Sequence, residues 1–221
     1  MAAEARSVRI DVWSDVVCPF CYIGKRKLEL ALAETGVDAR VRWHSFELDP
    51  AAPRATGPAL PDLLAAKYGL SQAAAVRMLE QQQQAAADVG LTYNWRTANR
   101  GNTFDAHRLI QFAESRGQAG DLAERLFRGY FVEGTPIWDS GALRRLALEV
   151  GLDADAVDAV LRSDAFAADV RDDERRAGEL GIHAVPHFVV NGRSVISGAR
   201  DVAHFITVLA AESVSPPLGR L

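Results

Sequence analysis

The chain has 221 residues, of which 48% are hydrophobic and 24% are charged, and its formal net charge is −4 at pH 7. This composition is typical of a soluble globular enzyme, and nothing in it suggests binding to nucleic acid or to a membrane. No apolar run approaches the length of a membrane span, and residues 1–9 lack the apolar core of a secretory signal, so we expect a cytoplasmic protein.

The first predicted elements are a strand and a helix with a cysteine pair between them. Residues 10–13 are typical of a short strand, and apolar residues recur over 22–32 closely enough to bury one side of a helix. The only two cysteines of the chain, Cys18 and Cys21, lie at this junction in a Cys-Pro-Phe-Cys motif. Proline is favoured at the first helical position, so Pro19 predicts that Cys18 is the N-cap.

This position favours redox chemistry of the two thiols. An anionic sulfur at Cys18 is stabilised by the helix dipole and can accept hydrogen bonds from the first backbone N–H groups. We therefore predict Cys18 as the nucleophile and Cys21, one turn further on, as the thiol that resolves a mixed disulfide. Other interpretations of the motif are half of a zinc site and a structural disulfide, and the latter is disfavoured because so short a loop constrains little of the unfolded chain. Zinc needs four ligands, and only His183 and His187 have ligand-like spacing, so we predict no metal.

The pattern then changes from strand to helix. Residues 41–46 alternate like a second strand, and residues 49–61, which hold four of the nine prolines, are typical of a linker. Helices are predicted over 60–68, 71–89, 103–116, 119–132, 139–150, 153–161 and 163–180. Because this helical stretch interrupts the β pattern, we predict one α/β domain with a helical insertion over 51–162. The insertion should cover the dithiol and shape access to it.

A second motif follows the predicted helices. Asn191-Gly192 between two β-branched runs is typical of a hairpin with a type I′ turn, so residues 187–190 and 194–197 should pair antiparallel. Pro186 stands just before the first of these strands, where a proline does not interrupt the ladder. The residue pattern by itself leaves the isomer of its peptide bond open.

Together the two motifs resemble the DsbA-like family of the thioredoxin-fold superfamily, and most closely its cytoplasmic FrnE-like branch. The resemblance implies that residues 1–50 and 163–221 form a discontinuous thioredoxin-like domain and that Pro186 is cis and packs against the dithiol. It also implies that the backbone of Val185 is offered to an incoming substrate chain. Two markers of the family are specific: the run from Asp15 to Gly24, and Val185-Pro186 followed by the hairpin that ends in Ser-Gly-Ala. Two others are weaker: Asn102-Thr103 with Ala106-His107-Arg108-Leu109, and Leu126-Phe127 with Tyr130-Phe131.

Three further residues are candidates for substrate binding. Phe20 stands where DsbA carries a histidine between its cysteines, so we expect an exposed apolar contact and a milder oxidant. His187 is either a positive charge near Cys18 or an ordinary strand residue. His107 either faces the dithiol across the cleft or is a hydrogen-bonded structural histidine.

The function predicted from these residues is thiol–disulfide exchange with disulfide- or thiol-bearing proteins or small thiols. No cofactor is expected, glutathione is left open as a co-substrate, and a homodimer is left open as the assembly. The first alternative is a glutathione-dependent isomerase or transferase related to 2-hydroxychromene-2-carboxylate isomerase, a group that typically has serine at the position of Cys18. The second is a binding module or holdase that uses the dithiol only as a redox sensor.

Overall fold

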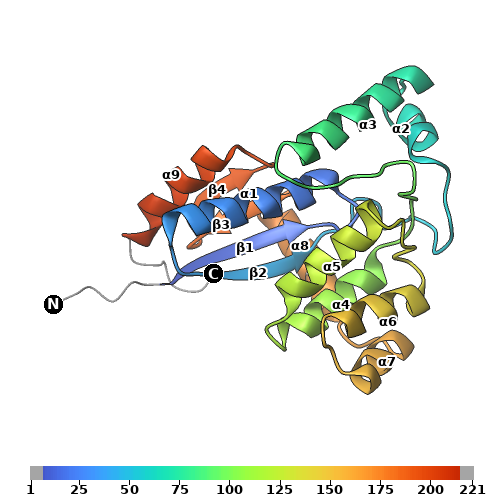
Figure 1. Ribbon diagram of the computed structural model, residues 1–221. Coiled ribbons are helices and arrows are strands. Elements are labelled where there is room, and N and C mark those ends of the chain that lie inside the picture. The colour runs from blue at the N-terminus through green and yellow to red at the C-terminus, as the bar shows by residue number, and fades with distance from the viewer. Residues whose placement is uncertain (1–6, 215–221) are drawn as a thin grey trace.

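A computed structural model describes residues 7–214, which form a four-stranded sheet with helices on both faces (Figure 1). The strand order is β2-β1-β3-β4. Strands β1 (Val8–Ser14) and β2 (Ala39–Ser45) are parallel, because helix α1 (Pro19–Thr35) crosses over between them. Strands β3 (His187–Val190) and β4 (Ser194–Ser197) form an antiparallel hairpin, and β3 pairs antiparallel with β1. The mixed sheet confirms the predicted thioredoxin-like α/β class.

Side chains of β1 alternate between two layers of helices. Helices α1 and α9 (Val202–Ser213) lie together on one face of the sheet, and α8 (Ala167–Glu179) lies on the other (Figure 1). Val12 belongs to the main core on the α1 side, whereas Trp13 packs with Ala177 of α8 in a smaller cluster. Successive strand residues point to opposite faces, so β1 is covered on both sides.

The helices predicted between residues 60 and 162 are all present, and they follow β2 and precede α8 in the sequence. Aromatic rings join this helical part to α1, because Tyr22 stacks on Phe127 and Phe131 with ring centroids 5.0 and 5.9 Å apart. The helices are α2 (Leu60–Tyr68), α3 (Gln72–Ala87), α4 (Phe104–Glu114), α5 (Ala119–Phe131), α6 (Ser140–Glu149) and α7 (Ala154–Arg162).

Two helices differ from the prediction. Helix α8 begins at Ala167 rather than at 163, because Phe166 adopts a left-handed φ of 62° and Arg108 binds backbone carbonyls in the preceding segment 160–165. Helix α9 was not predicted at all. Its cap is clear, since Asp201 accepts a hydrogen bond from the His204 N–H at 2.8 Å. Its exposed side carries many small apolar residues, however, so the helical period is weak in the sequence.

A polar cluster is buried between the sheet and α8. His44 bridges two carboxylates, with Nδ1 2.6 Å from Asp173 Oδ1 and Nε2 3.0 Å from Asp11 Oδ1, and its ring stacks on Trp13. Burial alone would lower the pKa of His44, but the hydrogen bonds with both carboxylates outweigh it and raise the pKa. Gln111 of α4 also donates to Asp173, so the cluster ties the helical part to the sheet.

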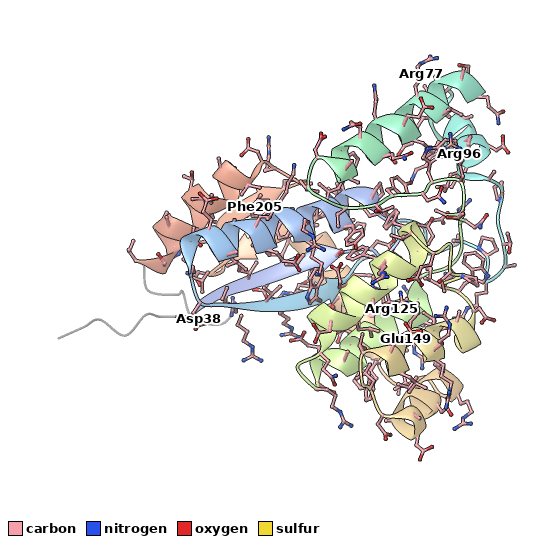
Figure 2. The ribbon with its side chains drawn as sticks, in the orientation of Figure 1. Asp38, Arg77, Arg96, Arg125, Glu149 and Phe205 are labelled. Atoms are coloured by element: carbon pink, nitrogen blue, oxygen red, sulfur yellow. The ribbon has the colours of Figure 1, made fainter. Side chains whose placement is uncertain are left out.

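Aromatic rings pack in the core and charged side chains form ion pairs at the surface, as the labelled residues in Figure 2 illustrate. Phe205 is fully buried in α9 and packs edge-to-face on Phe188 with centroids 5.0 Å apart. Arg125 and Glu149 join α5 to α6 at the surface, with Nε and Oε2 2.6 Å apart. None of the helices among residues 7–214 is long and apolar enough to span a bilayer.

Candidate active site

Cys18 caps helix α1, as the position of Pro19 predicts. Its φ of −87° and ψ of 114° are those of an N-cap, and Pro19 occupies the first helical turn. The expected hydrogen bond from the helix N–H groups to the sulfur is not formed; instead, the thiol Sγ lies 3.6 Å from the carbonyl oxygen of Val185. The Val185–Pro186 peptide bond is cis, as the resemblance implies. Cys18, the predicted nucleophile, therefore lies directly against the loop that precedes β3.

Helix α1 approaches this loop closely at a glycine. A Cβ added to Gly24 would lie 3.0 Å from Pro186 Cγ and 3.1 Å from Phe188 Cζ. Ordinary carbon contacts are about 3.5–4.0 Å. The absence of a side chain at Gly24 therefore lets α1 and the Pro186 loop pack around the dithiol.

The two thiols have different environments. Both are free, and their residues are 4% and 1% exposed for Cys18 and Cys21. Burial raises the pKa of the Cys21 thiol well above its ordinary value, and the adjacent Cys18 raises it further, although the Ser14 side chain and the Asp15 backbone act in the opposite direction. Cys21 is thus held as a protonated thiol behind Cys18.

Cys18 opens onto a cavity of about 720 Å³, and Cys21 does not line it. Phe20 is 44% exposed and forms part of the cavity wall, as does Val185. Most of the other lining side chains are apolar or aromatic and come from the helical part and its linkers. They include Leu48, Ala52, Leu60, Leu63, Leu64, Tyr68, Leu79, Tyr93 and Tyr130. The cavity therefore reaches Cys18 and not Cys21.

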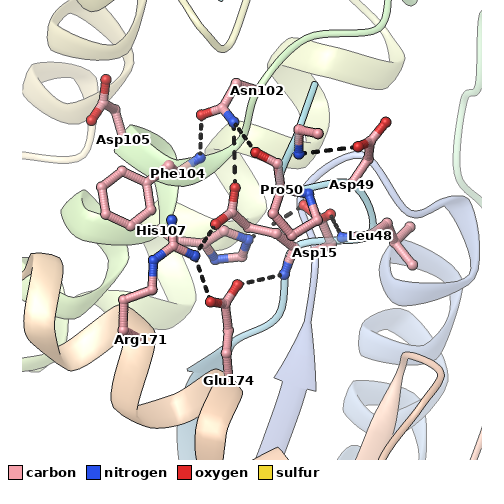
Figure 3. A network of polar contacts seen from close by, with 12 residues as sticks. Asp15, Leu48, Asp49, Pro50, Asn102, Phe104, Asp105, His107, Arg171 and Glu174 are labelled. Carbon is pink, nitrogen blue, oxygen red and sulfur yellow. Dashed lines mark hydrogen bonds and ion pairs between the residues drawn. The ribbon is translucent and has the colours of Figure 1, made fainter. Parts of the chain in front are cut away.

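Asp15 lies between this cavity and a buried polar network (Figure 3). Its Oδ2 accepts a hydrogen bond from the Leu48 N–H at 2.7 Å, and its Oδ1 is 3.4 Å from Nε2 of His107. His107 is 1% exposed and does not line the cavity, and its Nε2 has no hydrogen-bond partner within the described chain. Burial alone would lower the pKa of His107, but the Asp15 carboxylate prevails and raises it. The structure thus pairs His107 with Asp15 rather than exposing it to a ligand.

The network continues away from the cavity to α8. Glu47 is held by Arg171 Nη1 at 2.6 Å and by a longer contact from Asn102 at 3.4 Å (Figure 3). The same Arg171 contacts Glu174, and its guanidinium lies over the ring of Phe104. These contacts fix the β2–α2 linker, the start of α4 and α8 around Asp15.

His187 does not supply the positive charge considered for it. It is half-buried on β3, its ring lies edge-on to Trp13 at 6.4 Å, and it does not line the cavity. Burial lowers the pKa of His187 below 6.5, so the imidazole is neutral at pH 7. His183 is exposed, and no group of three potential metal ligands occurs within residues 7–214.

Asp15, Tyr93 and Tyr130 are among the cavity residues that were not predicted as site residues. Asp15 precedes the first cysteine by three residues, and Tyr130 belongs to one of the weaker family markers, so both carried a signal. Tyr93 lies in the segment between α3 and α4 and carried none, because its place beside Cys18 depends on how the helical part folds over α1.

The sheet order, the cysteine at the start of α1 and the adjacent proline loop together define a redox protein of the thioredoxin fold. Residues 9–210 match the DSBA-like thioredoxin domain, and the chain belongs to this family.

The chain is similar to several known proteins in sequence or in fold. The protein YwbO of Bacillus subtilis (strain 168) is 31% identical over 199 residues, which cover 87% of this chain and 91% of that protein. A probable DsbA oxidoreductase from Streptomyces coelicolor is 37% identical, covers 97% of this chain and 94% of its own, and superposes with a TM-score of 0.89. The cytosolic disulfide reductase DsbM from Pseudomonas aeruginosa, at 21% identity and 93% and 95% coverage, has a TM-score of 0.58 and shares the fold.

Proposed function

We propose that this protein is a thiol–disulfide oxidoreductase in which Cys18 is the nucleophile and Cys21 the resolving thiol. The observation that carries the proposal is the asymmetry of the pair: Cys18 caps α1 and opens onto the cavity, whereas Cys21 is sealed behind it and held as a thiol. Anionic sulfur is favoured at a helix N-terminus, and attack requires both the thiolate and access to it.

The proposed exchange has two steps. The Cys18 thiolate attacks one sulfur of a substrate disulfide, forms a mixed disulfide and releases the other substrate sulfur as a thiolate. Cys21 then loses its proton and attacks Cys18 Sγ, which forms the Cys18–Cys21 disulfide and releases the second substrate thiolate. The substrate is reduced and the protein oxidised, and the reverse sequence oxidises a dithiol substrate. The proposed partners are proteins or small thiols that carry such groups, including glutathione.

The assignment to the FrnE-like branch and a cytoplasmic location are proposed on the motif resemblance. The helix-start cysteine favours redox turnover over the isomerase alternative, because that group typically has serine at this position. A holdase that uses the dithiol only as a redox sensor would not require a cysteine that opens onto a cavity, as Cys18 does.

The test is a trapping experiment with single-cysteine variants. Cys21→Ser should accumulate mixed disulfides with a disulfide-bearing substrate such as insulin, because the second step is blocked. Cys18→Ser should trap none and should lose insulin reduction. If Cys21→Ser instead keeps full glutathione-dependent turnover and traps nothing, the isomerase alternative holds. If the wild-type protein reduces insulin no faster than buffer, the proposed function is wrong.

A further inference from the structure

Two buried tyrosines line the cavity that holds Cys18, and their hydroxyls have no hydrogen-bond partner among residues 7–214. Tyr93 and Tyr130 are 4% and 2% exposed, and both line the cavity. No residue in the described range 7–214 forms a hydrogen bond with either phenol. The hydroxyls are also absent from the polar atoms of that range that are sealed without a partner. Since both residues line the cavity and neither hydroxyl is sealed, we infer that the hydroxyls open onto that space.

Both rings are held firmly in place. Each packs edge-to-face on Phe131, with centroids 4.8 Å apart in both pairs. Both hydroxyls stay protonated at neutral pH, because burial raises the pKa of each phenol, and the nearby Cys18 adds to the effect at Tyr93. A protonated phenol donates one hydrogen bond. The pair thus offers two fixed donors in the cavity that Cys18 also lines, in surroundings where an unpaired hydroxyl is costly.

The rest of the cavity indicates what these donors bind. Its charged residues are two acids and two bases, and most are already engaged: Asp49 pairs with Arg100, and Asp15 is held by Leu48 and His107. The remaining base, Lys67, lies 5.7 Å from the centre of the Tyr68 ring. The charges balance, so the cavity does not favour a strongly anionic ligand.

Apolar surface dominates the remainder. Three of the large apolar side chains that stay exposed in the described chain, Phe20, Leu48 and Tyr68, all belong to this cavity. Its volume of about 720 Å³ falls within the roughly 300–1,000 Å³ usual for ligand sites. It has room for roughly twenty waters at about 30 Å³ each, which corresponds to a few amino-acid residues.

We propose that Tyr93 and Tyr130 donate hydrogen bonds to main-chain carbonyl oxygens of a polypeptide whose cystine reacts with Cys18, while its apolar side chains fill the cavity. The inference rests on the proposed function and names its substrate class: a cystine flanked by apolar residues in an extended chain. Carbonyl oxygens are neutral acceptors that recur along such a chain, and they match two donors in a charge-balanced apolar site. The two tyrosines are substrate-positioning residues contributed by the helical part of the chain.

The test compares two disulfides that release the same chromophore, 5-thio-2-nitrobenzoate. The first is the peptide Ala-Phe-Cys-Leu-Ala with its cysteine blocked by this group, and the second is the symmetrical disulfide of the chromophore, which has no peptide backbone. The variants are Tyr93→Phe, Tyr130→Phe and the double variant, each of which removes only hydroxyls. The matched control is Tyr22→Phe, because the Tyr22 hydroxyl binds Glu124 at 2.8 Å and does not line the cavity.

We expect each cavity variant to lower kcat/KM for the peptide by about 3- to 10-fold, mainly through KM, as the loss of one hydrogen bond predicts. The rate with the symmetrical disulfide should stay at the level of Tyr22→Phe. The inference is overturned if the peptide reacts equally well with all variants, or if both disulfides slow to the same extent, because the phenols would then act on Cys18. If wild-type protein releases no chromophore from either disulfide, the proposed function itself has failed.

Discussion

Replacement of Gly24 by alanine tests the packing of the dithiol helix against the Pro186 loop. The new Cβ would lie 3.0 Å from Pro186 Cγ and 3.1 Å from Phe188 Cζ, roughly half an ångström or more inside ordinary contact. Phe188 is 1% exposed and is backed by Phe205, so it has little room to move. Overpacking of this kind costs about 1–3 kcal/mol. Alanine in place of glycine inside a helix returns about 0.5–1 kcal/mol.

Gly178→Ala is the matched control, because this glycine also lies in a helix but a Cβ there would meet no atom within 4 Å. We expect it to keep or slightly raise the free energy of unfolding. The difference between the two variants isolates the clash, and we expect Gly24→Ala to be less stable by about 1–3 kcal/mol. For a chain of this size each kcal/mol corresponds to a change of about 2–4 °C in Tm.

Urea unfolding of the reduced proteins measures this difference in stability. Release of 5-thio-2-nitrobenzoate from its symmetrical disulfide measures the rate at which the dithiol reacts. A displaced Pro186 loop would move the Val185 carbonyl away from Cys18 Sγ, so Gly24→Ala should also react more slowly than Gly178→Ala. Equal stability and equal rates for the two variants would refute the close packing of α1 on this loop.

Three other predictions concern stability. Folding raises the pKa of His44 above 6.5 and lowers that of Asp11 below 3.8, so the contribution of the pair to the free energy of unfolding is largest between pH 3.8 and 6.5. This contribution is lost as the pH rises through the folded pKa of His44 or falls through the folded pKa of Asp11. A constant difference in the free energy of unfolding between wild type and His44→Gln from pH 5 to 9 would contradict this prediction. Asn191→Ala should lower the free energy of unfolding in urea by about 1–3 kcal/mol, because Asn191 has a φ of 52° and forms hydrogen bonds with Arg9 and Glu212. A decrease of less than about 0.5 kcal/mol would contradict this prediction. Arg175→Ala should leave the urea midpoint unchanged, because its two ion pairs are on the surface; a clear drop would show that they matter.

Local signals in the sequence predicted much of the fold. Pro19 after Cys18 correctly indicated a helix start, and Asn191-Gly192 correctly indicated a hairpin turn, with φ of 52° and 72° at the two residues. Both depend on neighbouring residues only. Helix α9 was missed because its apolar residues are spread around the helix, although Asp201 marks its start.

Contacts between distant residues could not be predicted in the same way. His107 meets Asp15 across 92 positions of the chain, and Tyr93 reaches the cavity only because the helical part packs against α1. His187 is neutral because neighbouring elements bury it and lower its pKa, and the strand pattern around His187 does not predict this burial. The two cysteines were visible in the sequence, but the difference in their access was not.

In the proposed mechanism Cys18 alone is presented for reaction, while Cys21 is sealed as a thiol. Alkylation of the reduced protein by iodoacetamide at pH 7, followed by mass spectrometry of the two sites over time, tests it most directly. We expect Cys18 to be modified at least tenfold faster than Cys21 in the folded protein and the two rates to converge in denaturant. Equal rates in the folded protein, or faster modification of Cys21, would contradict it.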